Sequence, residues 1–230
     1  MSNKTENAIS VLVQWMPFIL NGFLLNLVIS FLSMIIGTLL GVGLGLLRIS
    51  RRNYLSTGAR IFIQILQNTP WLVILFAVMF LVPSQFKIGS SQIAIAGWVQ
   101  ATVGLSLPIV ANVAEILRGS VHSIPSAQWE ACDSLGFNRR QALSMIILPQ
   151  CYKRMLPPWM SWYAILTLAT PIVAILGVRE GLGSAQAAME SAGAKPEYLM
   201  PFYGFVMILF FIYIYPIARW TRWLEQRVSQ

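Results

Sequence analysis

Residues 20–48 read LNGFLLNLVISFLSMIIGTLLGVGLGLLR, and no charged residue interrupts the run before Arg48. A helix rises about 1.5 Å per residue, so about 20 apolar residues cross the roughly 30 Å hydrocarbon core of a bilayer. The run is apolar throughout and does not alternate in polarity, which favours a helix over a barrel strand. This stretch therefore predicts a helix that spans a membrane.

The composition extends this prediction to the whole chain. Of its 230 residues, 57% are hydrophobic and 10% are charged, whereas about a quarter of the residues in ordinary soluble domains are charged. We predict an all-α membrane protein whose single transmembrane domain covers residues 1–230, with spans at about 17–47, 55–82, 92–117, 156–178 and 200–222. The first apolar run is too long for a signal peptide, so we expect the N-terminal region to be mature protein.

The basic residues predict the orientation, because lysine and arginine accumulate in cytoplasmic loops. If the C-terminus is cytoplasmic and the N-terminus is outside, the inner side holds twelve of the 16 basic residues: Arg48, Arg51, Arg52, Arg60, Arg118, Arg139, Arg140, Lys153, Arg154, Arg219, Arg222 and Arg227. The outer side keeps Lys4, Lys87, Arg179 and Lys195, and Glu180 is among the outer acids that balance them. Anionic membrane lipid suffices to explain the basic face, and we expect no nucleic-acid binding.

Two spans carry features with local physical meaning. Gly37, Gly41, Gly43 and Gly45 place small residues at helical spacing, which predicts close helix packing within the subunit or across a dimer. In the second span Pro70 follows Asn68 and Thr69, and a proline removes one helix hydrogen bond, so a kink is expected there. Such a kink either exposes backbone groups to a pathway or serves packing alone.

Asn112, Glu115 and Arg118 are spaced by three residues and therefore share a helix face. An acid near the end of a membrane helix normally pairs or turns inward. Two interpretations stay open for Glu115: an ion pair or a capping role with Arg118, and a role in a pathway or gate.

The segment at about 119–150 is the long polar insertion of the predicted inner side. Ser126 is in place to cap a short helix that runs to Leu135, and Gly136 can end this helix in a left-handed conformation. A second amphipathic stretch, from Arg139 to Ile147, is expected to stop before Pro149. Two short helices joined at a glycine suit docking into a partner, although an anchor on the membrane surface is the alternative.

Several kinds of chemistry find no support in the sequence. Cys132 and Cys151 lie on the predicted cytoplasmic side, where disulfides are rare, and His122 is the only histidine. A Gly-rich phosphate loop followed by Lys and Ser or Thr is missing, so the chain itself is not expected to hydrolyse ATP. We expect a non-catalytic subunit that binds no metal and no cofactor.

The insertion resembles a known motif. EACDSLGFNRRQALSMIILP is similar to the EAA loop of ATP-binding-cassette (ABC) importer permeases, which is Glu-Ala-Ala, three residues, Gly, nine residues, Ile, one residue and Leu-Pro. The motif positions are carried by Glu130, Ala131, Cys132, Gly136, Ile146, Leu148 and Pro149, with Cys132 in place of the second alanine. The resemblance implies that these residues couple the chain to a separate ATPase.

The resemblance extends to the polar amino-acid branch of these permeases, which handles histidine, glutamate, glutamine, arginine, cystine and opines. LQNTPWLVILF looks like its Arg-Gly-Thr-Pro segment, and EILRGSVHSIPSAQWEA matches its approach to the EAA loop. The implied protein is a multi-pass permease of the bacterial inner membrane that moves a polar amino acid or related small solute into the cytoplasm. Its implied partners are a cytoplasmic ABC ATPase dimer that holds ATP and Mg, a periplasmic or surface-tethered binding protein, and a second permease, for which we favour a different subunit.

The substrate end departs from this branch. In TLATPIVAILG, Leu168 and Ala169 stand where the branch often has a Lys-Asp pair, and Pro171 stands in place of a serine. Polar residues in or beside the spans are the candidates for a substrate pathway: Asn68, Thr69, Gln100, Asn112, Glu115, Thr167 and Thr170. The outer segment between the fourth and fifth spans is either the docking surface for the binding protein or a plain connector.

Two other functions have to be weighed against an importer. A self-contained secondary transporter or channel normally shows inverted repeats or an ionisable relay at mid-membrane, and neither is evident here. An intramembrane enzyme would need paired aspartates, metal-spaced histidines or a Ser-His pair, and the sequence offers none of them.

Overall fold

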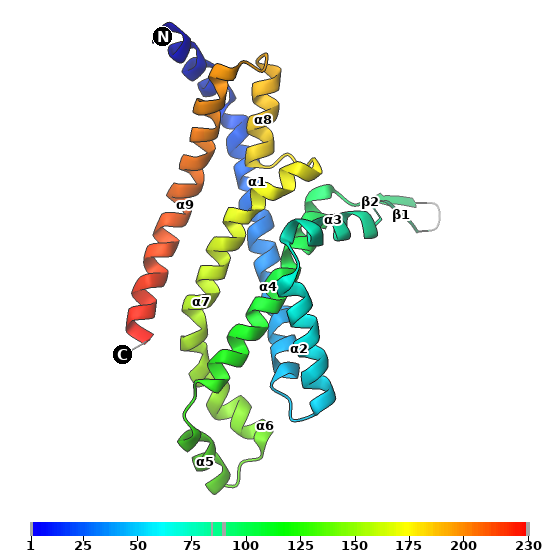
Figure 1. Ribbon diagram of the computed structural model, residues 1–230, viewed down its shortest axis with the longest axis vertical. Helices are drawn as coiled ribbons and strands as arrows, with labels where there is room; N and C mark the ends of the chain where they lie inside the picture. Colours follow the sequence, from blue (N-terminus) through cyan, green and yellow to red (C-terminus); the bar gives the residue numbers. More distant parts are fainter. Residues whose placement is uncertain (1, 84, 89–90, 229–230) are drawn as a thin grey trace. The chain divides into compact units, whose positions relative to one another are not determined.

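The computed structural model describes residues 2–83, 85–88 and 91–228, and these are mostly helical (Figure 1). The first half contains α1 (Ser2–Arg48), α2 (Asn53–Asn68), α3 (Trp71–Leu81), β1 (Gln85–Ile88), β2 (Ser91–Ala94) and α4 (Gly97–His122). The second half contains α5 (Ser126–Ser134), α6 (Arg139–Gln141), the π-helix η1 (Ala142–Ile147), α7 (Leu148–Ala169), the 3-10 helix η2 (Thr170–Leu176), α8 (Gly181–Ser191), the 3-10 helix η3 (Pro196–Tyr198) and α9 (Leu199–Val228).

The helical class is confirmed, but the chain is not entirely helical. Strands β1 and β2 pair antiparallel, with Gln85 opposite Ala94 and Ile88 opposite Ser91. The sequence QFKI alternates polar and apolar residues with the period of two that is typical of a strand. Consequently α4 begins at Gly97, five residues later than the predicted third span.

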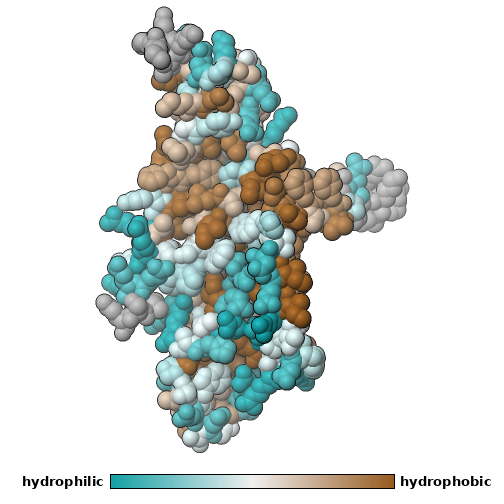
Figure 2. Space-filling model, in the orientation of Figure 1, coloured by the Kyte–Doolittle hydropathy of each residue, from teal (hydrophilic) through white to brown (hydrophobic). Residues whose placement is uncertain are grey.

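Four helical segments of the described chain are long and apolar enough to cross a membrane: Asn7–Arg48, Gly97–His122, Arg139–Leu176 and Pro196–Arg227. The pair α2 and α3 passes the same test only if the two helices form one broken span, which brings the number to five. Large apolar side chains remain exposed on these helices, as Figure 2 shows for the brown surface over α3, where Phe80 is 80% exposed. Such a surface suits lipid or another subunit rather than water.

The helix break at Pro70 confirms the predicted kink. Thr69 adopts an extended conformation with φ −93° and ψ 129°, and α2 ends at Asn68. The side chains of Asn68 and Thr69 donate to the carbonyls of Gln64 and Ile65, each 2.7 Å away. The bond from Thr69 reaches a carbonyl of the last turn, where intrahelical donors run out.

The chain forms two compact units, to which α1, α4, α7 and α9 all contribute. In the first unit, which comprises residues 1–34, 71–105 and 165–216, α8 packs beside α1 and α9 (Figure 1). Its core joins Tyr198 of η3 with apolar residues of the three helices: Ala8, Leu12, Ile19, Phe23, Ala185, Ala188, Met189, Phe202, Val206 and Phe210. Close approach of α8 to α1 depends on Gly22, because a Cβ there would lie 2.8 Å from the Cβ of Ser184.

In the second unit, which comprises residues 35–70, 106–164 and 217–230, the glycine spacing brings α1 against α4. An added Cβ would lie 2.5 Å from Ile109 at Gly37, 2.7 Å from Val113 at Gly41 and 2.8 Å from Leu117 at Gly45. Gly43 lies on the opposite side of α1 and meets nothing within 4 Å. The predicted close packing therefore occurs within the subunit, at three of the four glycines.

Replacing Gly41 by alanine tests this packing, with Gly43→Ala as the matched control. A Cβ at Gly41 would also meet the backbone carbonyl of Val110 at 2.8 Å, and a backbone atom cannot move aside as a side chain can. We expect Gly41→Ala to destabilise the protein by about 1–3 kcal/mol, which is typical of overpacking. Thermal unfolding of the detergent-purified protein measures this loss, and equal unfolding temperatures for the two variants would contradict the helix contact.

Candidate functional site

The segment from Ser126 to Pro149 begins with α5, whose start differs from the prediction. Ser126 is the first helical residue and not the N-cap; Pro125 is the N-cap, and no side chain bonds the first turn. Proline fits at the N-cap because its ring fixes its own φ, which is −55° here. The segment thus enters α5 through a rigid residue rather than through a hydroxyl cap.

The end of α5 follows the prediction. Gly136 has a φ of +76°, a left-handed conformation that residues with a Cβ rarely adopt. The N–H of Phe137 donates to the carbonyl of Cys132 at 3.0 Å, and the N–H of Gly136 donates to that of Asp133 at 3.0 Å. This pair of bonds is a Schellman motif, which satisfies the last carbonyls of the helix and turns the chain.

The second helix of the segment does not stop before Pro149, contrary to the prediction. Asn138 and Gln141 form a capping box at the start of α6, and the helix then runs through η1 into α7. The N–H of Leu148 donates to the carbonyl of Leu143, five residues back, so the hydrogen-bond register shifts just before Pro149. Pro149 has no N–H to donate to the helix, and a π-helical turn before it lets the helix continue.

A small apolar core holds the segment on the ends of α4 and α7. Its buried members are Leu117, Val121, Ile124, Ile147 and Cys151, and Val42, Ile49, Trp129, Ile146, Leu148 and Met155 pack around them. Arg139 adds two polar contacts, since its Nη2 donates to the carbonyl of Ile49 at 3.1 Å and its guanidinium lies 5.4 Å from the ring centre of Trp129. These contacts fix α5 and η1 to the helices that they connect.

The residues of the EAA-like pattern divide into two groups. Cys132 is buried, and Ile146 and Leu148 are half-buried in the apolar core just described. Glu130, Ala131, Gly136 and Pro149 are exposed, and the nearby side chains of Leu135 and Met145 are 76% and 62% exposed. Three of the seven residues therefore anchor the segment, while four lie on a surface that also presents exposed apolar side chains.

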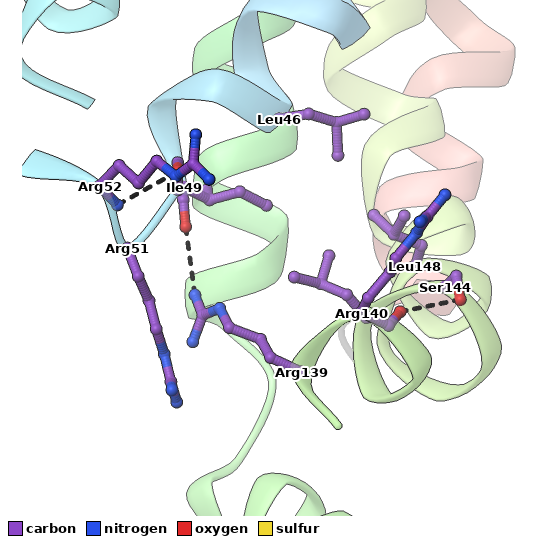
Figure 3. Close-up of a pocket in the computed structure, with 10 residues that line it drawn as sticks. Leu46, Ile49, Arg51, Arg52, Arg139, Arg140, Ser144 and Leu148 are labelled. Atoms are coloured by element: carbon purple, nitrogen blue, oxygen red, sulfur yellow. Dashed lines mark hydrogen bonds between the residues drawn. The ribbon is translucent and has the colours of Figure 1, made fainter. Parts of the chain in front are cut away.

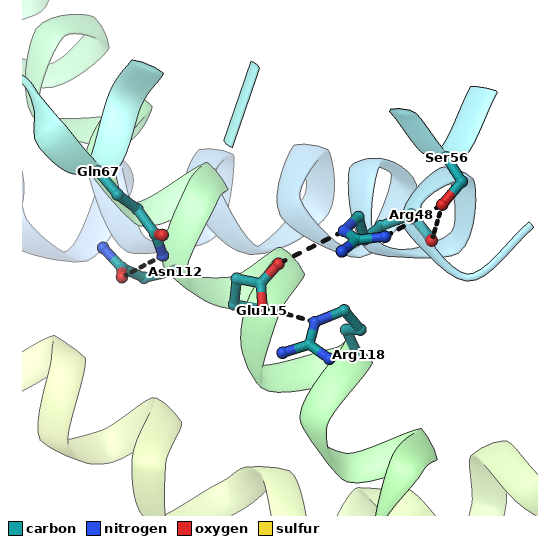
Figure 4. A network of polar contacts seen from close by, with 6 residues as sticks. All are labelled: Arg48, Ser56, Gln67, Asn112, Glu115 and Arg118. Carbon is teal, nitrogen blue, oxygen red and sulfur yellow. Dashed lines mark hydrogen bonds and ion pairs between the residues drawn. The ribbon is translucent and has the colours of Figure 1, made fainter. Parts of the chain in front are cut away.

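A polar network joins side chains of α1, α2 and α4 in the second unit (Figure 4). Glu115 accepts a hydrogen bond from Nε of Arg118 at 2.6 Å, and its other oxygen lies 3.8 Å from Nε of Arg48. Arg48 also donates to the hydroxyl of Ser56 at 3.0 Å. The predicted Glu115–Arg118 pair is present, and a second arginine shares the same carboxylate.

The other pathway candidates lie in different surroundings. Asn68 is exposed and Thr69 is half-buried at the end of α2, where Gln67 donates to Oδ1 of Asn112 at 3.1 Å. Gln100 is buried and donates to the carbonyl of Val82 at 2.7 Å. Thr167 and Thr170 are completely buried. The candidates therefore lie in separate places: Asn112 meets α2 through Gln67, while Thr167 and Thr170 adjoin each other. Among the described residues, no three His, Cys, Asp or Glu side chains gather to hold a metal ion.

Glu180 forms a buried site that the sequence analysis missed. Its side chain is 0% exposed and caps α8 by accepting hydrogen bonds from the N–H groups of Leu182 at 3.0 Å and Gly183 at 2.9 Å. Nδ2 of Asn26 donates to it at 2.6 Å, and Oδ1 of Asn26 accepts from the N–H of Gly181. Burial raises the pKa of this carboxyl, which follows the candidate span, although these hydrogen bonds lower it in part. The sequence signal that could have indicated this cap is the Glu180-Gly181 pair at the start of an apolar helix.

The same asparagine joins a predicted pathway residue to this buried site. Nδ2 of Asn26 also donates to the hydroxyl of Thr170 at 2.8 Å, and Thr170 donates to the carbonyl of Thr167 at 2.7 Å. A buried carboxylate is costly unless hydrogen bonds satisfy it, and here each oxygen has a donor. The arrangement fastens α8 to α1 within the first unit.

The family described as "Binding-protein-dependent transport system inner membrane component" matches residues 37–230, most of the chain and all of the segment from Ser126 to Pro149. This chain belongs to that family. Its membership makes it an inner membrane component of an importer, and in such systems a separate subunit hydrolyses ATP and a binding protein delivers the solute.

Two relatives illustrate the match to this family of inner membrane components. The "Probable amino-acid ABC transporter permease protein YckA" of Bacillus subtilis (strain 168) is 35% identical over 174 residues, which cover 76% of this chain and 74% of that protein. The "Octopine transport system permease protein OccM" of Rhizobium radiobacter is 28% identical over 221 residues, which cover 93% of this chain and 90% of that protein.

Solved structures share the fold of this family member. A chain from the "Crystal structure of an amino acid ABC transporter with histidines" aligns with a TM-score of 0.80 at 24% identity, over 94% of this chain and 96% of that chain. A chain of the MetNI methionine ABC transporter in an inward facing conformation aligns with a TM-score of 0.73 at 19% identity, over 94% and 98%. At these identities the likeness establishes the fold alone.

Replacing Asn26 by alanine tests the buried site, with Asn68→Ala as control. The change removes the shortest hydrogen bond to Glu180 and leaves the N–H of Gly181 without its acceptor. We expect a loss of about 1–3 kcal/mol, the cost of unsatisfied buried polar groups. The control removes an exposed amide that bonds only its own helix. Thermal unfolding distinguishes the two, and an unchanged unfolding temperature for Asn26→Ala would refute the role of this contact.

Replacing Gly136 by alanine tests the turn after α5, with Gly119→Ala as control. Alanine at φ +76° costs about 1–2 kcal/mol, whereas Gly119 lies in α4 with open space around an added Cβ. Hydrogen exchange should therefore quicken at the amides of Gly136 and Phe137, which close the Schellman motif, in the first variant only. Equal protection in both variants would show that the left-handed residue does not hold this turn.

Proposed function

We propose that the chain is the membrane-spanning permease subunit of an ABC importer that moves a polar amino acid or a related small solute into the cytoplasm. The observation that carries this proposal is the family match over residues 37–230, which includes the whole EAA-like segment. Several relatives bear the names of amino-acid or opine permeases, which supports the substrate class. The same match speaks against a self-contained secondary transporter.

The proposed topology has five spans, with α2 and α3 forming one broken crossing, the N-terminus outside and the C-terminus in the cytoplasm. The bias of basic residues supports this orientation. It places α5, α6 and η1 on the cytoplasmic side, where an ATPase is available. It also places α8 and η3 toward the outer side, and we propose this segment as the docking surface for the binding protein.

The proposed coupling residues are those of the EAA-like pattern. Glu130 presents an exposed carboxylate on α5, which suits a charge-assisted contact with a basic group of the ATPase. Gly136 permits the turn between the two short helices. Ile146 and Leu148 pack in the apolar core at the ends of α4 and α7, so a displacement of the exposed surface would be passed to these helices. Cys132 is buried within α5. Closure of the ATPase dimer around ATP and Mg would then shift the balance between two packed states.

The proposed substrate pathway is confined to Asn68, Thr69, Asn112 and Glu115 of the second unit. Asn68 is exposed, Thr69 is half-buried and Glu115 is 28% exposed, so a solute could reach these side chains although each also makes a hydrogen bond within the chain. Asn112 is buried and accepts a hydrogen bond from Gln67 of α2. Gln100, Thr167 and Thr170 are buried in internal hydrogen bonds, which favours a packing role for them. We also propose a second permease as partner, and a different subunit rather than an identical one, because Leu168 and Ala169 lack the charges usual in this branch.

Charge reversal at Glu130 tests the coupling role. Glu130→Arg should weaken association with the cognate ATPase by about tenfold or more, since an attractive charge contact becomes repulsive. Glu225→Arg is the matched control, because Glu225 is an exposed acid on α9 that is also on the proposed cytoplasmic side. Co-purification from membranes and solute uptake measure the effect.

The outcomes separate the two levels of the proposal. If the unmodified chain, expressed with its neighbouring genes, never co-purifies with an ATPase, the importer function is refuted. If the ATPase does bind but the two variants behave alike, the function stands and the role of Glu130 is wrong.

A further inference from the structure

A basic pocket of about 730 Å³ lies in the second unit, between the end of α1 and the start of the helix that continues through η1 (Figure 3). It is separate from the exposed carboxylate of Glu130. Its walls come from the last turn of α1, the α1–α2 connection, α6, η1 and the first residue of α7: Leu46, Ile49, Ser50, Arg51, Arg52, Arg139, Arg140, Leu143, Ser144 and Leu148.

Four arginines line this pocket, and none of the described acidic residues is among its lining residues. Arg139 is held in place by the carbonyl of Ile49 and the ring of Trp129, and Arg52 donates to the hydroxyl of Tyr54 at 3.3 Å. Within the described chain, the side chains of Arg51 and Arg140 form neither a hydrogen bond nor an ion pair. Positive charges that repel one another and have no counter-charge in the protein favour an anionic ligand.

The rest of the lining consists of two serines, Ser50 and Ser144, and of apolar side chains. Leu46 is 41% exposed beside the arginines, and Leu143 and Leu148 are half-buried on the facing wall. Figure 3 shows Arg51 and Arg52 extending from the connection after α1, while Arg139 and Arg140 extend from α6. A ligand that fills this space has an anionic end that meets the arginines and an apolar part that lies against the leucines.

We propose that this pocket binds the phosphate headgroup of an anionic phospholipid of the inner leaflet. Guanidinium groups bind phosphate oxygens through paired hydrogen bonds, and basic pockets on the cytoplasmic side of membrane helices suit anionic headgroups. The pocket adjoins the end of one candidate span, Asn7–Arg48, and the start of another, Arg139–Leu176, on the side that the proposed orientation makes cytoplasmic. This inference rests on the orientation given under the proposed function.

The lipid reading accounts for both kinds of lining residue. An acidic side chain of a partner protein would explain the arginines, but it would leave Leu46 and Leu143 without an apolar partner. A phospholipid places acyl carbons directly beside its phosphate. Because Arg139 and η1 both line the pocket, a bound headgroup would fasten the α1–α2 connection to the segment that we propose to couple to the ATPase.

The double substitution Arg51→Gln and Arg140→Gln tests the proposal in the full chain, purified together with its associated subunits. Neither side chain supports the fold through a hydrogen bond, so the variant should assemble normally. Binding to nanodiscs of phosphatidylcholine with a small share of fluorescent phosphatidylglycerol should weaken by about thirtyfold, because each arginine near a membrane surface contributes about fivefold. The matched control is Arg219→Gln with Arg222→Gln, which removes two exposed arginines of α9 on the same proposed side.

A loss of phosphatidylglycerol binding in the pocket variant alone, with soluble glycerol phosphate unable to compete, supports a lipid site. Competition by soluble glycerol phosphate or by inorganic phosphate would show that the pocket takes free phosphate, which overturns the lipid. Equal lipid binding by both variants, or loss of the ATPase from the pocket variant without a change in lipid binding, would also overturn it. Co-purification of the ATPase with the unmodified chain tests the importer function, and lipid binding by the variants tests the pocket, so the two claims can fail separately.

Discussion

Every peptide N–H and C=O group at membrane depth has to be paired inside the protein, because hydrocarbon offers no partner. The long helices α1, α4, α7 and α9 meet this requirement through their own backbone ladders. Where the regular ladder is interrupted, other groups take over. Before Pro70 the hydroxyl of Thr69 donates to the carbonyl of Ile65 in the last turn of α2, and before Pro149 the ladder shifts to a five-residue register. At these two prolines the chain supplies its own substitutes.

Local signals made most of the coupling segment predictable. Gly136 could be assigned to a left-handed turn because few other residues tolerate that backbone. The glycine spacing in α1 indicated close packing because small residues let two helix backbones approach each other in lipid. The errors were local as well. Serine is a common N-cap, so Ser126 was a plausible cap, but Pro125 is the N-cap and Ser126 is the first helical residue. Pro149 was expected to end a helix, but a π-helical turn carried the helix through it.

Contacts between distant parts of the chain were not predictable in this way. Glu180 was counted among the outer charges, because nothing near it in sequence indicates that Asn26 lies within 2.6 Å. The order of helices in each unit and the partners of buried amides depend on tertiary packing that periodicity does not encode. The strands β1 and β2 were overlooked for a different reason: four alternating residues are a weak pattern beside long apolar runs.

The contact between Glu180 and Asn26 joins residues that are 154 positions apart. A ribosome delivers Asn26 to the membrane long before it delivers Glu180, so α1 carries an unmatched amide through most of synthesis. Burial of the Glu180 carboxylate, in turn, costs free energy until that amide is close enough to donate to it. The nascent chain must therefore keep the α1 surface around Gly22 and Asn26 available until α8 arrives, and final assembly of the first unit becomes a late step in biogenesis.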